Sequence, residues 1–454
     1  MTEAVVARHS SRGLVGLLCA QTLALTGTRM TMVVLPWFAL TLTGSAAATG
    51  VVAFCEMAPY LIVKFLAGPL LDRVGSRRTN IVADAASFIA VGSIPLLNAT
   101  GHLRFSLLLV LVAVAGAARG PGDAAKSTLV PDVAAAAGTP LERATGLSGT
   151  IDRLGQTAGP FLGGFLTAWL GTLSALGFTA IAFAVSGAVV ALTAPRHRVA
   201  AEGSAGPVEE DEQGYRHELR SGVRVLWTDP LLRAITGMAG VTNMIDAAVF
   251  AIVLPVWARS TGAGPTAIGL VVAAAGGGAV VGSIVATVLA GRLPRRRTYL
   301  LAFLIGGAPR IAVLAFHVPV PAIVAIWGAS GLALGLINPI LSATIYERIP
   351  PRMLGRTWAL TSTVSFVGVP VGGLLLGGSV AFVGANATII AAAVAYFLAT
   401  MLPAFRPEWR QMDRAGAPGD ADPPEVGEQA ASGPVGAGEP TPNTEPGRAG
   451  SARH

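Results

Sequence analysis

Long apolar stretches, separated by short polar or Gly- and Pro-rich breaks, make up most of the chain. Twelve are recognised in two series of six, at 13–41, 46–70, 79–98, 103–124, 144–170 and 173–194, then at 231–258, 265–291, 299–317, 320–345, 354–379 and 382–404. Each is near the length of about 20 residues with which a helix crosses the hydrocarbon core of a bilayer. The pattern predicts an all-α integral membrane protein with twelve transmembrane helices.

The composition agrees with this class. Of the 454 residues, 52% are hydrophobic and 13% are charged, and the mean hydropathy is +0.62. Soluble proteins carry about 25% charged residues, so an ordinary soluble protein is excluded. The net charge of +7 does not indicate nucleic acid, because the basic residues fall in short loops. The expected surroundings are a lipid bilayer.

The basic residues also predict the orientation, because Lys and Arg concentrate in cytoplasmic loops. With both termini in the cytoplasm, the external turns contain only Arg104 and Arg259. The cytoplasmic turns then contain Arg73, Arg77, Arg78, Lys126, Arg143, Arg292, Arg295, Arg296, Arg297, Arg348, Arg352 and Arg356. We expect a multi-pass protein of the cell (inner or plasma) membrane with both termini cytoplasmic.

The longest internal break, 195–230, divides the spans into an N-terminal half, 1–194, and a C-terminal half, 231–405. Within it, apolar residues recur at i, i+4 and i+7 at Leu219, Val223 and Leu226. This spacing predicts an amphipathic helix on the cytoplasmic interface that tethers the halves. Residues 406–454 are rich in Pro, Gly, Ala and Glu without periodicity, which predicts a disordered cytoplasmic tail.

The two halves resemble each other. Residues 34–37 (Val-Leu-Pro-Trp) end the first span, and 253–257 (Val-Leu-Pro-Val-Trp) end the seventh. Residues 159–164 in the fifth span resemble 369–373 in the eleventh, with glycines and a proline at like positions. We predict two pseudo-symmetric six-helix halves of like orientation, which rock about a midplane site.

A polar turn between the second and third spans carries the clearest motif, 68–78, Gly-Pro-Leu-Leu-Asp-Arg-Val-Gly-Ser-Arg-Arg. It resembles the loop signature of the major facilitator superfamily, Gly-x-x-x-Asp-Arg-x-Gly followed by basic residues, although Ser76 stands where the first basic residue is usual. The resemblance implies the major facilitator fold and transport by alternating access. Its gate residues here would be Gly68, Asp72, Arg73, Gly75, Arg77 and Arg78.

The charges of this loop suggest how a gate would work. Asp72 ends a helix, where a carboxylate is unfavourable unless it finds a partner. The start of the eleventh span, near 354–356, could supply one when the cytoplasmic side is closed. Arg77 and Arg78 could pair with acids of the neighbouring loop, Asp132 or Glu142. The alternative is that all of these are orientation charges only.

The fifth span contains a second motif, 155–164, Gly-Gln-Thr-Ala-Gly-Pro-Phe-Leu-Gly-Gly. Close helix packing and a proline bend explain it physically. It also resembles the fifth-span motif of antiporters in the superfamily, which implies export in exchange for protons. The matching positions are Gly155, Gly159, Pro160, Gly163 and Gly164. Softer signatures at 118–131, 142–144, 218–233 and 338–344 resemble the macrolide-efflux and enterobactin-exporter branch.

Charged residues inside the spans need a reason, since each is unfavourable by about 2.5–3.5 kcal/mol at the bilayer centre on insertion scales. Arg29 and Glu56 lie at similar depth, so an ion pair is feasible, either in proton coupling or as static filling. Asp246 has no partner in its own helix and is the first candidate for protonation, with Asn243 one turn away.

Other charges fit less central roles. Arg310, beside Gly306, Gly307 and Pro309, is expected to face the outer vestibule and completes the coupling candidates. Lys64 is expected to be structural. Asp84 and Arg119 are expected to belong to the cytoplasmic gate network.

Nothing indicates an enzyme. The six histidines show no ligand spacing within a span, Cys19 and Cys55 fall toward opposite membrane faces, and no phosphate-binding loop follows a strand. No metal, cofactor or nucleotide is expected.

The prediction is a monomeric exporter of hydrophobic or amphiphilic small molecules by proton antiport. The alternatives are a dedicated exporter of one siderophore or natural product, an uptake symporter, and a non-transporting scaffold.

Overall fold

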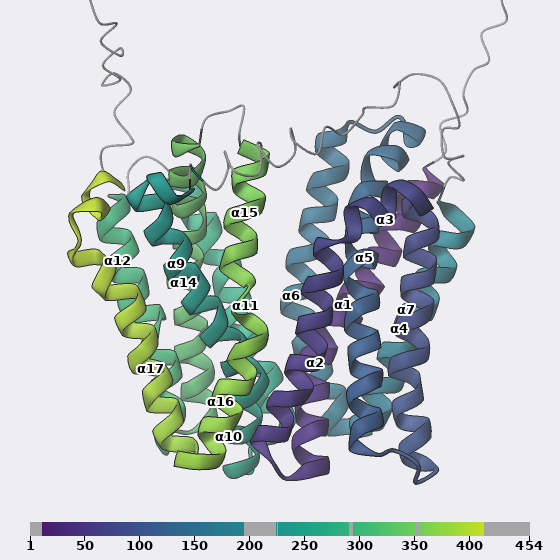
Figure 1. Ribbon diagram of the computed structural model, residues 1–454, viewed down its shortest axis with the longest axis horizontal. Helices are drawn as coiled ribbons and strands as arrows, with labels where there is room; N and C mark the ends of the chain where they lie inside the picture. The colour runs from purple at the N-terminus through teal and green to yellow at the C-terminus, as the bar shows by residue number, and fades with distance from the viewer. Residues whose placement is uncertain (1–10, 195–223, 225, 290–293, 350–353, 413–454) are drawn as a thin grey trace, which may run out of the picture. The chain divides into compact units, whose positions relative to one another are not determined.

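The computed structural model describes residues 11–194, 224, 226–289, 294–349 and 354–412, and these are helical with no strand. The N-terminal half begins at α1 and ends at α7 (Figure 1). Its helices are α1 (Arg12–Thr43), α2 (Ala46–Phe65), α3 (Ala67–Val74), α4 (Ser76–Ala99), α5 (Phe105–Ala137), α6 (Leu141–Leu170) and α7 (Thr172–Thr193).

The C-terminal half is more broken. Its elements are α9 (Pro230–Ala248), the π-helix η1 (Val249–Val253), α10 (Leu254–Ser260), α11 (Gly264–Val288), α12 (Arg295–Gly306), α13 (Ala308–Ala312), the 3-10 turn η2 (Val313–Ala315), α14 (Val320–Arg348), α15 (Leu354–Phe366), α16 (Val369–Val383), α17 (Ala385–Met401) and the 3-10 turns η4 (Leu402–Phe405) and η5 (Pro407–Met412). Several of the breaks fall at Gly or Pro, as at Gly307, Gly368 and Gly384, because these residues interrupt or end a helix.

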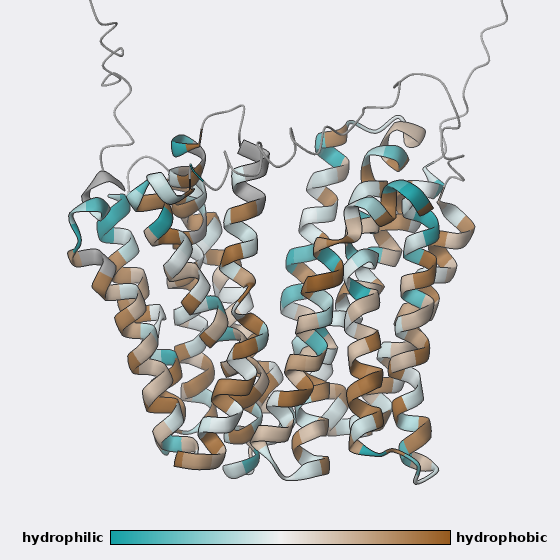
Figure 2. Cartoon of the chain, in the orientation of Figure 1, coloured by the Kyte–Doolittle hydropathy of each residue, from teal (hydrophilic) through white to brown (hydrophobic). Residues whose placement is uncertain are grey.

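Ten helical segments of the described chain are long and apolar enough to cross a membrane. The predicted fifth span is α6, a helix of 30 residues that is more polar, and the twelfth is α17, a shorter apolar helix. Large apolar side chains are exposed on the outer helices, including Leu192, Phe382 and Phe405, and Figure 2 shows apolar residues along the helices. Exposed apolar surface of this extent is what contact with lipid requires.

Each half has its own packing. In the N-terminal half, α1 packs on α6 and α7, and α4 packs on α5 and α7. In the C-terminal half, α11 packs on α14, and α9 packs on α15 and α16. The C-terminal core is the larger and contains the fully buried rings of Trp327, Tyr299 and Trp409.

The two halves contact each other through glycines. Gly50 of α2 lies against the backbone of Gly373 and Gly377 in α16. Gly164 of α6 lies against Pro265 and Gly269 of α11. If the halves are repeats, the second span corresponds to the eighth and the fifth span to the eleventh. The contact of α2 with α16 is then equivalent to the contact of α6 with α11.

The tail prediction is wrong at its start. Residues Pro407–Met412 form η5, and Trp409 is buried with its ring centroid 4.6 Å from that of Tyr299. A buried indole contributes enough apolar area to hold a short polar segment. The predicted amphipathic linker helix lies almost wholly outside the described residues, as do 413–454.

Candidate functional site

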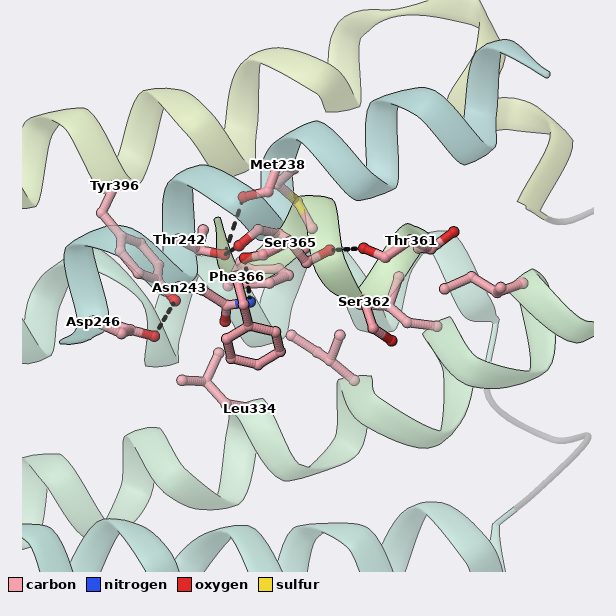
Figure 3. Close-up of a pocket in the computed structure, with 15 residues that line it drawn as sticks. Met238, Thr242, Asn243, Asp246, Leu334, Thr361, Ser362, Ser365, Phe366 and Tyr396 are labelled. Carbon is pink, nitrogen blue, oxygen red and sulfur yellow. Dashed lines mark hydrogen bonds between the residues drawn. The ribbon is translucent and has the colours of Figure 1, made fainter. Parts of the chain in front are cut away.

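A cavity of about 440 Å³ lies in the C-terminal half, between α9, α14, α15 and α17 (Figure 3). Most of its wall is aliphatic or aromatic, with the hydroxyls of Thr242, Thr361, Ser362 and Ser365. Asp246 is the one charged residue among those that line it. A cavity of this volume with a mainly apolar wall and several hydroxyl groups suits a small amphiphilic ligand.

Asp246 forms an ion pair with Arg310 of α13, and its carboxylate also accepts a hydrogen bond from the Tyr396 hydroxyl at 3.5 Å. The Arg310 guanidinium lies 5.2 Å from the ring of Trp327 and 5.5 Å from that of Tyr396. The Asp246 side chain is 26% exposed and that of Arg310 is 5% exposed. The carboxylate therefore faces the cavity, and the cation lies behind it among aromatic rings.

The outer-vestibule prediction for Arg310 is wrong, and the partner of Asp246 is now identified. The reason is the break at Gly307 between α12 and α13. A Cβ atom added there would stand 2.9 Å from the Tyr396 ring. Because glycine permits this approach, α13 lies against α17 and directs Arg310 inward.

Asn243 lies one turn before Asp246 and joins two walls of the cavity. Its amide donates to the carbonyl of Ser365 in α15 at 3.0 Å. Three residues after Asp246 the helix widens into the π-helix η1. Such wide turns are frequent at functional sites.

In the N-terminal half, Glu56 pairs with Arg119 at 2.9 Å, and Arg119 also donates to the Thr31 hydroxyl at 2.8 Å. Both side chains of the pair are buried. The feasible pair of Glu56 with Arg29 is therefore not formed, and Arg119 does not belong to a cytoplasmic gate. The cause is Gly116, which lets α5 approach the Glu56 backbone and places Arg119 one turn away on the same face.

Arg29 instead contacts α6. Its stem packs on Gly159, and its guanidinium donates to Met32 Sδ at 3.6 Å. No carboxylate lies within ion-pair distance of Arg29 in the described residues.

The fifth-span motif forms two packing surfaces on α6. Gly155 and Gly163 face α1, where a Cβ on Gly163 would stand 2.9 Å from the Met30 carbonyl. Gly164 faces α11, and the Pro160 carbonyl stands 3.0 Å from a Cβ built on Gly269. Ordinary helix packing accounts for these glycines physically.

The loop motif contains an extra helix. Gly68, Asp72 and Arg73 lie in α3, and Gly75, with φ of +85°, separates α3 from α4. Asp72 is exposed. Arg77 donates to the Ala191 carbonyl of α7 and not to an acid of the neighbouring loop, so that pairing is wrong for Arg77. Arg78 is exposed.

The corresponding turn of the C-terminal half carries an ion pair. Arg295 makes two hydrogen bonds to the Glu347 carboxylate, at 2.6 and 2.7 Å. These bonds lower the pKa of Glu347 below its ordinary value. They join the start of α12 to the end of α14.

Comparison with known proteins identifies the family of this chain. The family model described as Major Facilitator Superfamily matches residues 17–247 and 236–427. The chain belongs to the Major Facilitator Superfamily. It is thus a multi-pass membrane transporter with the major facilitator fold, and not an enzyme.

Relatives within the superfamily cover nearly the whole chain. The multidrug efflux pump Tap of Mycobacterium tuberculosis is 32% identical over 419 residues, 90% of this chain and 97% of that protein. The multidrug efflux pump Tap of Mycolicibacterium fortuitum is 27% identical over 396 residues, 86% of this chain and 95% of that protein.

Solved superfamily structures share the fold. The nucleoside transporter NupG superimposes with a TM-score of 0.69 at 12% identity, over 88% of this chain and 98% of that one. A bacterial homologue of the lysosomal transporter Spinster, in an inward-facing and unoccupied conformation, gives 0.66 at 15% identity, over 89% and 97%.

This superfamily member also contains a buried network of residues that were expected at the cytoplasmic gate or in a cytoplasmic turn. Asp84 of α4 pairs with Lys126 of α5 at 2.8 Å and accepts from Ser186 of α7 at 2.7 Å. Lys126 was expected in a cytoplasmic turn, but α5 continues to Ala137, so Lys126 lies inside the helix. The network ties α4, α5 and α7 together, which is a structural role.

Proposed function

We propose that this transporter exports hydrophobic or amphiphilic small molecules in exchange for protons, by alternating access in the cell membrane. Relatives named multidrug efflux pumps support drug efflux. The observation that carries the proposal is the Asp246 carboxylate, which faces an apolar cavity of drug size while its cation lies behind it. The transporter acts as a monomer with both termini in the cytoplasm.

The contacts between the halves support a conformation that is closed toward the outside. Gly50 and Gly269 lie near the starts of α2 and α11, and Gly164 and Gly377 lie near the ends of α6 and α16. In the predicted orientation all four positions are on the external side. Arg259, at the end of α10, also donates to the Leu40 carbonyl near the end of α1. A transporter closed outside loads substrate from the cytoplasm, as export requires.

The proton is carried by Asp246. When ionised, the carboxylate holds Arg310; when protonated, it loses most of that attraction. Arg310 then remains between the rings of Trp327 and Tyr396, which stabilise a cation without a carboxylate. Protonation thus removes the electrostatic attraction between α9 and α13, while the aromatic rings still stabilise the Arg310 cation. Asn243 links this change to α15 through Ser365.

Glu56 and Arg119 form the corresponding pair of the N-terminal half, but both side chains are buried. We assign them to holding α2 against α5. In this proposal the loop charges act as the cytoplasmic gate. Asp72 is exposed in the present conformation, and it approaches the start of α15 when the cytoplasmic side closes.

The test is accumulation of a fluorescent lipophilic dye such as ethidium in cells that express the transporter, with and without a protonophore. Expression should lower accumulation several-fold only while the proton gradient stands. Asp246→Asn and Asp72→Ala should each reduce this effect, and Asp420→Asn, a matched acidic residue near the C-terminus, should not. Dye uptake on expression, or full activity of Asp246→Asn, would refute the proposal.

A further inference from the structure

Arg29 differs from the other buried or half-buried arginines whose contacts are described. Arg77 donates to a carbonyl, Arg119 to Glu56 and Thr31, and Arg310 to Asp246. Arg29 donates only to the Met32 thioether, a weak acceptor. A guanidinium inside a transmembrane bundle without an oxygen acceptor is unfavourable, so its position needs a reason.

The packing of α1 on α6 sets that position. Gly159 accommodates the stem of Arg29, and a side chain at residue 159 would displace it. Asp152 lies seven residues before Gly159 on the same face of α6, which is about 10 Å along the helix axis. Side chains on a helix lean toward its N-terminus, so Arg29 leans toward the level of Asp152.

Asp152 is the matching unpaired acid. Its carboxylate makes no hydrogen bond or ion pair with any described residue, although Arg29 exerts the strongest attraction among the charges that act on it. Arg29 and Asp152 thus lie on two helices that pack together, and no ion pair joins them.

A second set of charges extends the same face onto α2 and α5. Lys64 donates to the Tyr60 hydroxyl at 3.0 Å, and Tyr60 donates to Asp123 at 3.3 Å. Asp123 is therefore already engaged, whereas Asp152 is not. Lys64 is exposed and stands one residue before the end of α2, where its ammonium reaches water.

We propose that Arg29 and Asp152 form a binding subsite for the zwitterionic head group of an amphiphile, with its acidic group on Arg29 and its ammonium on Asp152. Such a ligand satisfies both unpaired charges at once and brings no net charge into the bundle. Arg29 offers the planar fork that carboxylates bind. The subsite is separate from the Asp246 cavity and from the Glu56–Arg119 pair. The inference rests on the proposed transport of small molecules.

The test uses three forms of one fluorescent amphiphile: Nε-dansyl-lysine, its methyl ester and its Nα-acetyl derivative. They share the dansyl group and the lysine side chain, and their head groups are zwitterionic, cationic and anionic. Each is titrated into the purified full-length transporter in detergent, and the rise in dansyl fluorescence gives Kd. The wild type should bind the zwitterion about tenfold more tightly than either derivative, since each lost contact is a hydrogen bond between charged groups.

Two variants assign the charges separately. Arg29→Gln should remove the preference for the zwitterion over the ester, and Arg29→Lys should restore part of it. Asp152→Asn should remove the preference over the acetyl derivative. Arg12→Gln, an exposed arginine of the same helix, should keep both preferences. Size-exclusion chromatography establishes that each variant is folded.

Equal Kd values for the three probes in the wild type would overturn the proposal. So would an Arg29→Gln variant that weakens all three equally, because that is the result of a purely structural arginine. Binding in detergent requires no proton gradient and no flux. Equal binding of the three probes would therefore leave the proposed export unaffected. Loss of dye export by a protein that still prefers the zwitterion would count against proton antiport alone.

Discussion

At the scale of single residues, the described bundle pairs its most buried charges. A buried pair gains little over apolar filling, but removing one partner leaves an uncompensated charge. The pairs therefore explain why single substitutions should be severe.

For Glu56 and Arg119, Glu56→Gln or Arg119→Leu alone should lower the free energy of unfolding by about 3–5 kcal/mol, because the remaining group stays buried. The double variant Glu56→Leu/Arg119→Leu should be closer to wild type than either single change. Thermal unfolding in detergent gives the comparison. A double variant that loses the sum of the single losses would contradict a mutually compensating pair.

The glycines of α6 allow a matched comparison within one helix. A Cβ at Gly163 would meet the Met30 backbone, so Gly163→Ala should destabilise the protein by about 1–3 kcal/mol. Gly146→Ala, where no atom lies within 4 Å, should be neutral or stabilise by up to about 1 kcal/mol. Equal melting temperatures of the two variants would show that the fifth-span motif does not act through packing.

At the scale of elements, the apolar runs predicted the ten described segments that are long and apolar enough to span a membrane, because the hydrocarbon core requires about 20 apolar residues. They also predicted α6, which is more polar, and α17, which is shorter. They did not predict how charged side chains pair. The partners Asp246 and Arg310 are 64 residues apart in the chain, and only the Gly307 break turns α13 so that they meet. The same holds for Lys126, since nothing local in α5 indicates that the helix continues past two prolines to Ala137.

The end of the C-terminal half offers a test of an element that composition misassigned. Trp409→Ala should reduce the free energy of unfolding by about 3–5 kcal/mol, because its indole is fully buried against Tyr299. Trp227→Ala, at an indole that is 62% exposed, is the matched control and should be nearly neutral. Similar melting temperatures for both variants would place Trp409 outside the core.

At the scale of the whole molecule, alternating access requires two halves that separate on one side while they meet on the other. Gly377 lies against α2, whereas its neighbour Gly378 meets no atom within 4 Å. Gly377→Val should therefore hinder external closure and reduce dye efflux at least several-fold, while Gly378→Val retains it. The two variants should express equally. Full efflux by Gly377→Val would contradict external closure through α2 and α16.

The central claim is that a proton on Asp246 drives export, and purified protein in proteoliposomes tests it most directly. An imposed proton gradient should drive ethidium movement against its concentration gradient in the wild type, with protons moving the opposite way. Asp246→Asn should bind ethidium yet show no gradient-driven accumulation. Accumulation by Asp246→Asn equal to wild type, or wild-type accumulation that is indifferent to the proton gradient, would contradict the account.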